Sequence, residues 1–181
     1  HYLEHRLDMH NSHQSFATRQ RLLNYDGNAS NQIIWFTDAR PGTPQFDQTP
    51  QAFLVLDQWL KNIKAHPERS VAKNKPADAV DACFATNGSL LAKGNGVWNG
   101  ILDNGPNGAC TNVFPLNSSS RIVSGGPIEG SVFKCRRQPV KRALRRGVYG
   151  AWQPTDAELA RLQEIFPTGV CDYSKPDQGR P

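Results

Sequence analysis

Apolar residues recur at helical spacing in several stretches of the chain. The most regular stretch is residues 49–66, where Thr49 can cap a helix and Pro50 suits its first position. The apolar positions of this stretch predict one face, formed by Phe53, Leu56, Leu60 and Ile63 and broadened by Val55 and Trp59. The spacing therefore predicts an amphipathic helix that ends near His66.

Capping and stop signals predict three further helices. Side chains that accept hydrogen bonds from free backbone N–H groups favour a helix start, whereas glycine and proline favour its end. The first signal is Asn11 or Ser12 before a helix on which Phe16, Gln20 and Leu23 share one face. Pro139 and Gly147 enclose a short helix, and the capping box of Thr155 and Glu158 begins the last helix, which Pro167 ends.

One apolar run predicts a buried strand. Residues 32–37 are rich in β-branched and aromatic side chains, and residues 38–44 contain the proline and glycine of a loop. Helix, strand, loop and helix in this order indicate an α/β fold. Asp38 directly follows the strand, where such folds commonly place their active sites. The alternative is that its carboxylate pairs with Arg40 within the loop.

Residues 70–130 differ in character, because Asn-Gly and other glycine turn signals interrupt them. We expect a short helix over residues 78–83 and a short strand or hairpin arm over residues 96–102. The serines at 118–120 and at 124 match neither a nucleophile elbow nor a phosphate-binding loop, and they are interpreted as flexible loops.

The composition describes a loop-rich domain. The 181 residues can bury a substantial core, and they include 15 glycines and 13 prolines. No apolar run is long enough to span a membrane. The chain starts without an initiator methionine, and we expect a processed or fragmentary piece of a longer protein whose signal peptide is removed or lies outside it.

Four cysteines, Cys83, Cys110, Cys135 and Cys171, suggest two disulfides. Their spacing lacks the C-x-x-C pairs typical of zinc sites, and we expect no metal or cofactor. Three connectivities are open. Pairing 83 with 110 and 135 with 171 is favoured, because each bond then closes a loop-rich segment on itself. Together with three Asn-x-Ser sequons, the cysteines indicate an oxidising compartment, so the chain is expected to be secreted or periplasmic.

The positive charge is concentrated in one segment. The formal net charge is +5, yet seven basic residues between 134 and 146 have no acid among them, so the rest of the chain is slightly acidic. Such a segment could bind nucleic acid. However, stacking aromatics and recognition motifs are missing, so a solvated basic face is favoured and no nucleic acid partner is expected.

Residues 7–23 concentrate more acid–base chemistry than any other window. Asp8 precedes His10 by two residues, and His13 follows near the predicted helix start. A carboxylate close to an imidazole can orient it for proton transfer. The alternative interpretation is a polar helix start with histidines at the surface.

Several stretches resemble the C-terminal part of a family of large secreted bacterial proteins of unassigned function. The family is in turn more distantly similar to tannase-like and feruloyl-esterase-like α/β-hydrolases. The stretches are Leu7–His10, Gln14–Leu22, Asn31–Trp35, Ala52–Leu60, Ser124–Ile128, Val132–Cys135 and Ile165–Tyr173.

The resemblance implies that the chain is the C-terminal portion of an α/β-hydrolase-like domain. Residues 1–69 would carry the last core strand and helix, and residues 70–181 a loop-rich, disulfide-linked extension packing on the core. Asp8 would occupy the position of the triad acid. The loop that usually holds the triad histidine contains none here, so His10, or less favourably His13, becomes the base, with Asp8 or Asp38 orienting it.

These inferences predict one part of a secreted serine-type ester hydrolase. Its nucleophilic serine would come from the N-terminal portion of the same precursor or from another chain. The alternative is a non-catalytic binding or structural subunit of a secreted complex, because no nucleophile motif occurs in the chain.

Overall fold

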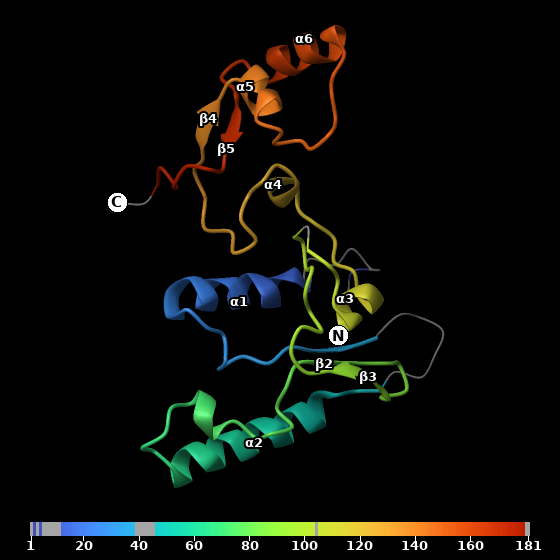
Figure 1. Cartoon of the computed structure of the whole chain (residues 1–181), viewed down its shortest axis with the longest axis vertical. Coiled ribbons are helices and arrows are strands. Elements are labelled where there is room, and N and C mark those ends of the chain that lie inside the picture. Colours follow the sequence, from blue (N-terminus) through green and yellow to red (C-terminus); the bar gives the residue numbers. More distant parts are fainter. Residues whose placement is uncertain (1, 3, 5–11, 39–45, 104, 180–181) are drawn as a thin grey trace. The chain divides into compact units, whose positions relative to one another are not determined.

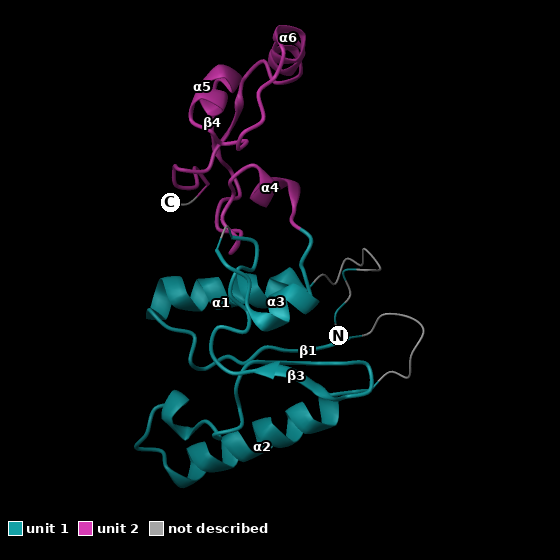
Figure 2. Ribbon diagram, turned by 45° about the vertical axis from the view of Figure 1, so that its right-hand side comes forward, with its two compact units in different colours: residues 1–117 teal, residues 118–181 magenta. Residues whose placement is uncertain are grey.

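The computed structural model describes residues 2, 4, 12–38, 46–103 and 105–179. The chain divides into two compact units, residues 1–117 (unit 1) and residues 118–181 (unit 2), which are drawn in different colours in Figure 2. Each unit contains one of the two disulfides. The units are therefore described one at a time.

Unit 1 is built on a three-stranded sheet with the order β1-β2-β3. Strand β1 (Trp35–Thr37) runs parallel to β2 (Ala82–Phe84), which pairs antiparallel with β3 (Leu90–Lys93). Helix α1 (His13–Asp26) and helix α2 (Thr49–Ala65) lie on opposite sides of the strands (Figure 1). The mixture of helices and small sheets fits the predicted α/β class.

Aromatic rings form the core between α1 and the sheet. Phe36 of β1 packs against Trp98 with ring centroids 4.8 Å apart, and Phe16 of α1 contacts both rings edge-on. Tyr2 and Phe114 extend the cluster, with their centroids 5.1 Å apart. Apolar burial and edge-to-face ring packing together stabilise this side of unit 1.

The cystines have the pairing favoured from the sequence. Cys83 of β2 is bonded to Cys110 of α3 (Ala109–Val113), and both side chains are fully buried. Cys135 is bonded to Cys171 in unit 2. The bonded cysteines lie 27 and 36 positions apart in the sequence, and each bond restrains the chain between them.

Two local predictions in unit 1 are wrong. Residues 82–84 form β2 instead of the end of a helix, because Ala82 donates its N–H to the Ile34 carbonyl at 3.1 Å. Residues 96–102 form consecutive turns instead of a strand, and Gly96 and Gly100 adopt the positive φ angles of 76° and 78° that these turns need. Tertiary hydrogen bonds and turn chemistry outweigh local propensity in both places.

Helix α2 is confirmed in position but differs in its burial. It is followed by a short 3₁₀ helix, η2 (Ala72–Asn74). The buried side chain of α2 is Trp59, whose indole N–H donates to the Val71 carbonyl at 2.7 Å. Phe53 is 67% exposed and Leu60 50% exposed, although both belong to the predicted apolar face. Helix α2 therefore presents apolar side chains that unit 1 does not cover.

Unit 2 consists of three helices and a two-stranded ladder. Helix α4 (Ser120–Val123) is followed by β4 (Arg136–Gln138), α5 (Val140–Arg145), α6 (Asp156–Ile165) and β5 (Val170–Asp172). Strands β4 and β5 pair antiparallel, and the disulfide of Cys135 to Cys171 ties them together. The predicted capping box at the start of α6 is confirmed, since Thr155 and Glu158 exchange both hydrogen bonds.

The predicted division of the chain at residue 69 separates a hydrolase-like core from an extension. Strand β1 lies before this position and β2 after it, and the two pair directly. The assignment of residues 1–69 to a hydrolase core follows from the resemblance and stays a prediction.

Candidate functional site

Asp38 lies at the carboxyl end of strand β1, which pairs parallel with β2. It directly follows β1 and forms a parallel bridge with Tyr2, while the Tyr2 N–H donates to the Thr37 carbonyl at 3.0 Å. On the other side, the Asp38 N–H donates to the Phe84 carbonyl at 3.0 Å. The backbone of Asp38 is therefore held from both sides at the sheet edge where α/β proteins bind ligands.

The other two predicted catalytic residues, Asp8 and His10, fall outside the described residues. The same applies to Arg40, the predicted alternative partner of Asp38, and to residues 39–45 as a whole. The roles assigned to Asp8 and His10 stay predictions.

His13, the alternative base, is the first residue of α1 and is half-buried. Burial lowers the pKa of its imidazole, and Arg21 lowers it further, while the negative charge of Glu4 acts in the opposite direction. The net effect lowers the pKa of His13 from its ordinary value, which favours the neutral imidazole. A neutral imidazole is the form that a general base requires.

Glu4 is a buried carboxylate that holds the start of α1. One of its oxygens accepts the N–H of Ser12 at 2.9 Å, and the other accepts the N–H of Asn117 at 2.9 Å. Two backbone N–H groups thus replace the water that a buried carboxylate loses. Glu4 therefore anchors the N-cap residue of α1, and nothing in the sequence pattern marks it for this role.

The Ser12 hydroxyl is buried beside the hydrogen bonds of Glu4. Ser12 is the N-cap residue of α1, yet its side chain makes no capping hydrogen bond, and its Oγ has no partner among the described residues. At the start of α1, the described part of unit 1 therefore brings together an imidazole with a lowered pKa, a buried carboxylate and a hydroxyl without a partner.

No metal centre is evident in the described residues, where no three His, Cys, Asp or Glu side chains are grouped so as to hold an ion. Among the described helices, none is both long and apolar enough to cross a membrane. Two disulfides link the chain, as is typical of proteins from an oxidising compartment.

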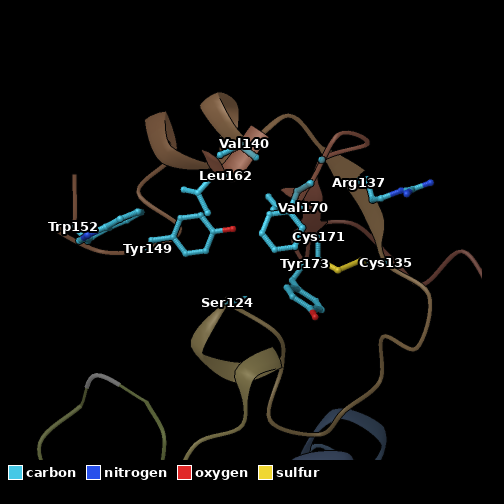
Figure 3. A pocket seen from close by; sticks show the side chains of 12 residues that line it. Ser124, Cys135, Arg137, Val140, Tyr149, Trp152, Leu162, Val170, Cys171 and Tyr173 are labelled. Carbon is cyan, nitrogen blue, oxygen red and sulfur yellow. A yellow bond between two sulfur atoms is a disulfide. The ribbon is translucent and has the colours of Figure 1, made fainter. Parts of the chain in front are cut away.

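Unit 2 contains a cavity that the sequence patterns did not indicate. Its volume is about 510 Å³, and aromatic and aliphatic side chains from α5, α6 and β5 line most of it (Figure 3). Four aromatic residues between positions 149 and 173 contribute to the lining, and this local enrichment is the one sequence signal that could have located the site.

Two residues of the basic segment make polar contacts within unit 2. Arg146 forms an ion pair with Asp172 at 2.9 Å and also donates to the Gln138 side chain at 3.0 Å. Arg137 donates to the Thr168 hydroxyl. Both arginines therefore help to hold the ladder of β4 and β5 to its surroundings.

Comparisons with known proteins assign the family. No curated protein and no solved structure matches the chain. The profile of one protein family, described as a tannase-like family of unknown function (DUF6351), matches residues 1–181, which is the whole chain. The resemblance expected from the sequence is thereby confirmed at the family level, and the chain belongs to this tannase-like family.

Proposed function

We propose that this chain is the C-terminal portion, or a processed subunit, of a secreted serine-type ester hydrolase. The observation that carries the proposal is Asp38 at the carboxyl end of parallel β1, in a chain whose full length matches a tannase-like family. The carboxyl end of a parallel strand is where an α/β-hydrolase needs a triad residue.

In this proposal His10 is the general base and Asp8 or Asp38 orients it. The imidazole must reach a serine hydroxyl and a carboxylate at the same time. The serine comes from polypeptide outside this chain, either the N-terminal portion of the same precursor or another chain. His13 is the second candidate for the base, and its lowered pKa supports a neutral imidazole at this end of α1.

The exposed face of α2 supports packing against further polypeptide. Phe53 and Leu54 are each about two-thirds exposed, and Leu56 and Leu60 are half exposed. A group of large apolar side chains left exposed on one helix of a folded unit supports an interface at this helix. We assign this face to the N-terminal portion of the same precursor, because a hydrolase core needs helices and strands that residues 1–69 do not provide.

The assay uses the complete protein, including the serine-bearing portion, with a 4-nitrophenyl ester as substrate. We expect His10→Ala to lower kcat/KM at least about a thousandfold without unfolding, because removing a triad base removes most of the rate enhancement. His66→Ala is the matched control, since His66 lies at the exposed end of α2 and should leave the rate unchanged. A large loss in His13→Ala alone would transfer the base role to His13.

The orienting carboxylate is identified by Asp8→Asn and Asp38→Asn in the same assay. The variant that removes the orienting group should lose about 10²–10⁴ in kcat, because the imidazole then adopts the wrong tautomer. Full activity in both histidine variants and both aspartate variants would contradict the proposal.

The second candidate function is a non-catalytic binding subunit. It is favoured by the apolar cavity of unit 2, a unit with its own disulfide. A fluorophosphonate probe separates the two functions, because it labels an activated serine and leaves a binding subunit unlabelled.

A further inference from the structure

The cavity in unit 2 has the size of a small-molecule site. At about 510 Å³ it lies within the range of ligand pockets, which is roughly 300–1,000 Å³. Figure 3 shows Val140, Leu162, Val170 and Tyr173 around it, with Tyr149 and Trp152 at one end.

Several constraints keep the cavity walls in place. The disulfide of Cys135 to Cys171 fixes one wall, and the ion pair of Arg146 with Asp172 holds the end of β5. Gly169 has a φ of +89° and lies so close to the Gln138 carbonyl that any larger residue would collide with it. The cavity is therefore largely preformed, as binding sites for small molecules commonly are.

The lining selects for aromatic ligands. Tyr149, Trp152, Phe166 and Tyr173 contribute rings, and the remaining wall is mostly aliphatic. Aromatic faces and edges pack favourably against another planar ring, beyond the gain from burying apolar surface alone. A flat aromatic group therefore matches both the chemistry and the volume of the cavity.

Among the described residues, none presents a charged group to the cavity that could balance an ionic ligand. Arg137 is a charged residue of the described lining, but its guanidinium points away from the cavity in Figure 3 and donates to the Thr168 hydroxyl. The Ser124 hydroxyl donates to the Ser120 carbonyl at 2.8 Å. Because burying an unpaired charge is costly, the ligand should be uncharged.

Tyr149 offers a polar contact inside this apolar site. Its hydroxyl points toward the middle of the cavity in Figure 3, and it has no hydrogen-bond partner among the residues that the structure describes. Burial and the neighbouring Tyr173 raise the pKa of Tyr149, so the phenol remains protonated at neutral pH. It can donate a hydrogen bond to a ligand oxygen or accept one from a ligand hydroxyl.

We propose that unit 2 carries a binding site for an uncharged, planar aromatic group with one oxygen substituent, held among Tyr149, Trp152 and Leu162. The site lies wholly within residues 118–181. This proposal holds whether or not the chain forms part of an ester hydrolase, because none of the proposed triad residues contributes to the binding site.

Isothermal titration calorimetry on the full 181-residue chain tests this site. The probes are 2-naphthol, naphthalene and 2-naphthalenesulfonate, which share the ring system and differ in the polar group. We expect 2-naphthol to bind with a stoichiometry of one. The sulfonate should bind at least about tenfold more weakly, because its negative charge would lose its hydration in the cavity without gaining an opposite charge. Absence of saturable 2-naphthol binding, or equal binding of the sulfonate, would overturn the proposal.

Two tryptophan substitutions on α6 locate the site. Leu162→Trp places a bulky ring in the cavity and should weaken 2-naphthol binding at least about tenfold. Ile165→Trp is the matched control on the same helix, since Ile165 is exposed and does not line the cavity, and it should bind as the wild type does. Wild-type affinity in Leu162→Trp, or an equal loss in Ile165→Trp, would contradict this location.

Two milder variants keep the test informative if Leu162→Trp does not fold. Trp152→Ala removes an exposed ring and should weaken both 2-naphthol and naphthalene. Tyr149→Phe keeps the ring and removes the hydroxyl, so it should reduce the preference for 2-naphthol over naphthalene and leave naphthalene binding unchanged. Unchanged affinities in both variants would overturn the assignment.

Discussion

Arg19 of α1 and Asp81, which directly precedes β2, form a bidentate ion pair. Nη1 of Arg19 lies 2.5 Å from Oδ2 of Asp81, and Nη2 lies 2.8 Å from Oδ1. Asp81 Oδ1 also accepts the N–H of Ile34 at 2.8 Å, and Arg19 Nε donates to Gln32 at 3.1 Å. One carboxylate thus joins the helix, the approach to β1 and the start of β2, which lie far apart in the sequence.

The first prediction concerns this pair. Asp81→Asn should lower the free energy of unfolding by about 2 kcal/mol, because the mostly buried guanidinium of Arg19 loses its negatively charged partner and its bidentate pairing. Urea denaturation followed by circular dichroism measures the change. Asp57→Asn is the matched control: Asp57 pairs with Lys61 on the exposed side of α2, and its loss should cost less than about 0.5 kcal/mol. Equal effects of the two variants would contradict the role assigned to Asp81.

The second prediction concerns the acid stability of unit 2. The hydrogen bond from the Ser174 hydroxyl, together with Arg146, lowers the pKa of Asp172 from 3.8 to about 2. A carboxylate whose pKa is lower in the folded state stabilises the fold above the unfolded pKa, and the effect is lost as the pH falls from about 4 to 2.

The measurement is Tm between pH 7 and pH 2 for the wild type and Asp172→Asn. The difference in Tm between the two proteins should be constant above about pH 5 and shrink as the pH falls from about 4 to 2, because the unfolded state then binds a proton at Asp172 more readily than the folded state does. Ser174→Ala should show an intermediate difference, since it removes the largest contribution to the pKa shift. A constant difference down to pH 2 would refute the assignment.

The third prediction concerns the disulfide of unit 2. Replacing Cys135 and Cys171 by serine should lower the free energy of unfolding of this unit by about 4 kcal/mol, as expected for a closed loop of 36 residues. Hydrogen exchange should rise in β4 and β5, while the amides of β1 and β2 keep their protection because their own disulfide is intact. Simultaneous loss of protection in both units would contradict the division into two units.

The fourth prediction concerns the start of α6. Thr155→Ala removes the side chain that accepts the Glu158 N–H and should cost about 1 kcal/mol, whereas Thr155→Ser should retain the stability. Thermal unfolding of the three proteins measures this. Equal loss in the serine variant would show that the methyl group of Thr155, and not its hydroxyl, stabilises the helix start.

Local signals in the sequence located the helices α1, α2, α5 and α6 and the disulfides, but they missed α3, and α4 begins at Ser120 where a flexible loop was expected. Thr155 and Glu158 define the start of α6 because a capping box satisfies N–H groups only a few residues away. Sequential pairing of the cysteines is confirmed as well, since each bond closes the segment between neighbouring cysteines. The family resemblance, carried by motifs spread along the chain, is also confirmed.

Residues 78–84 show where local signals fail. The expected short helix gives way to strand β2, because Asp81 is engaged by Arg19 and Ile34 while Cys83 is bonded to Cys110. These partners lie between 27 and 62 residues away. Periodicity within a short window contains no information about them.

For the candidate sites, the sequence by itself determined which residue types are present: the carboxylates and imidazoles of residues 8–38, and the aromatic side chains after residue 148. Only the tertiary structure decided that Glu4 holds the start of α1, that Asp38 lies at the end of a parallel ladder, and that Tyr149 faces an apolar cavity. The physical reason is that burial and hydrogen bonding between distant segments set the role of a polar side chain, whereas helix starts and turns depend on neighbours within a few residues.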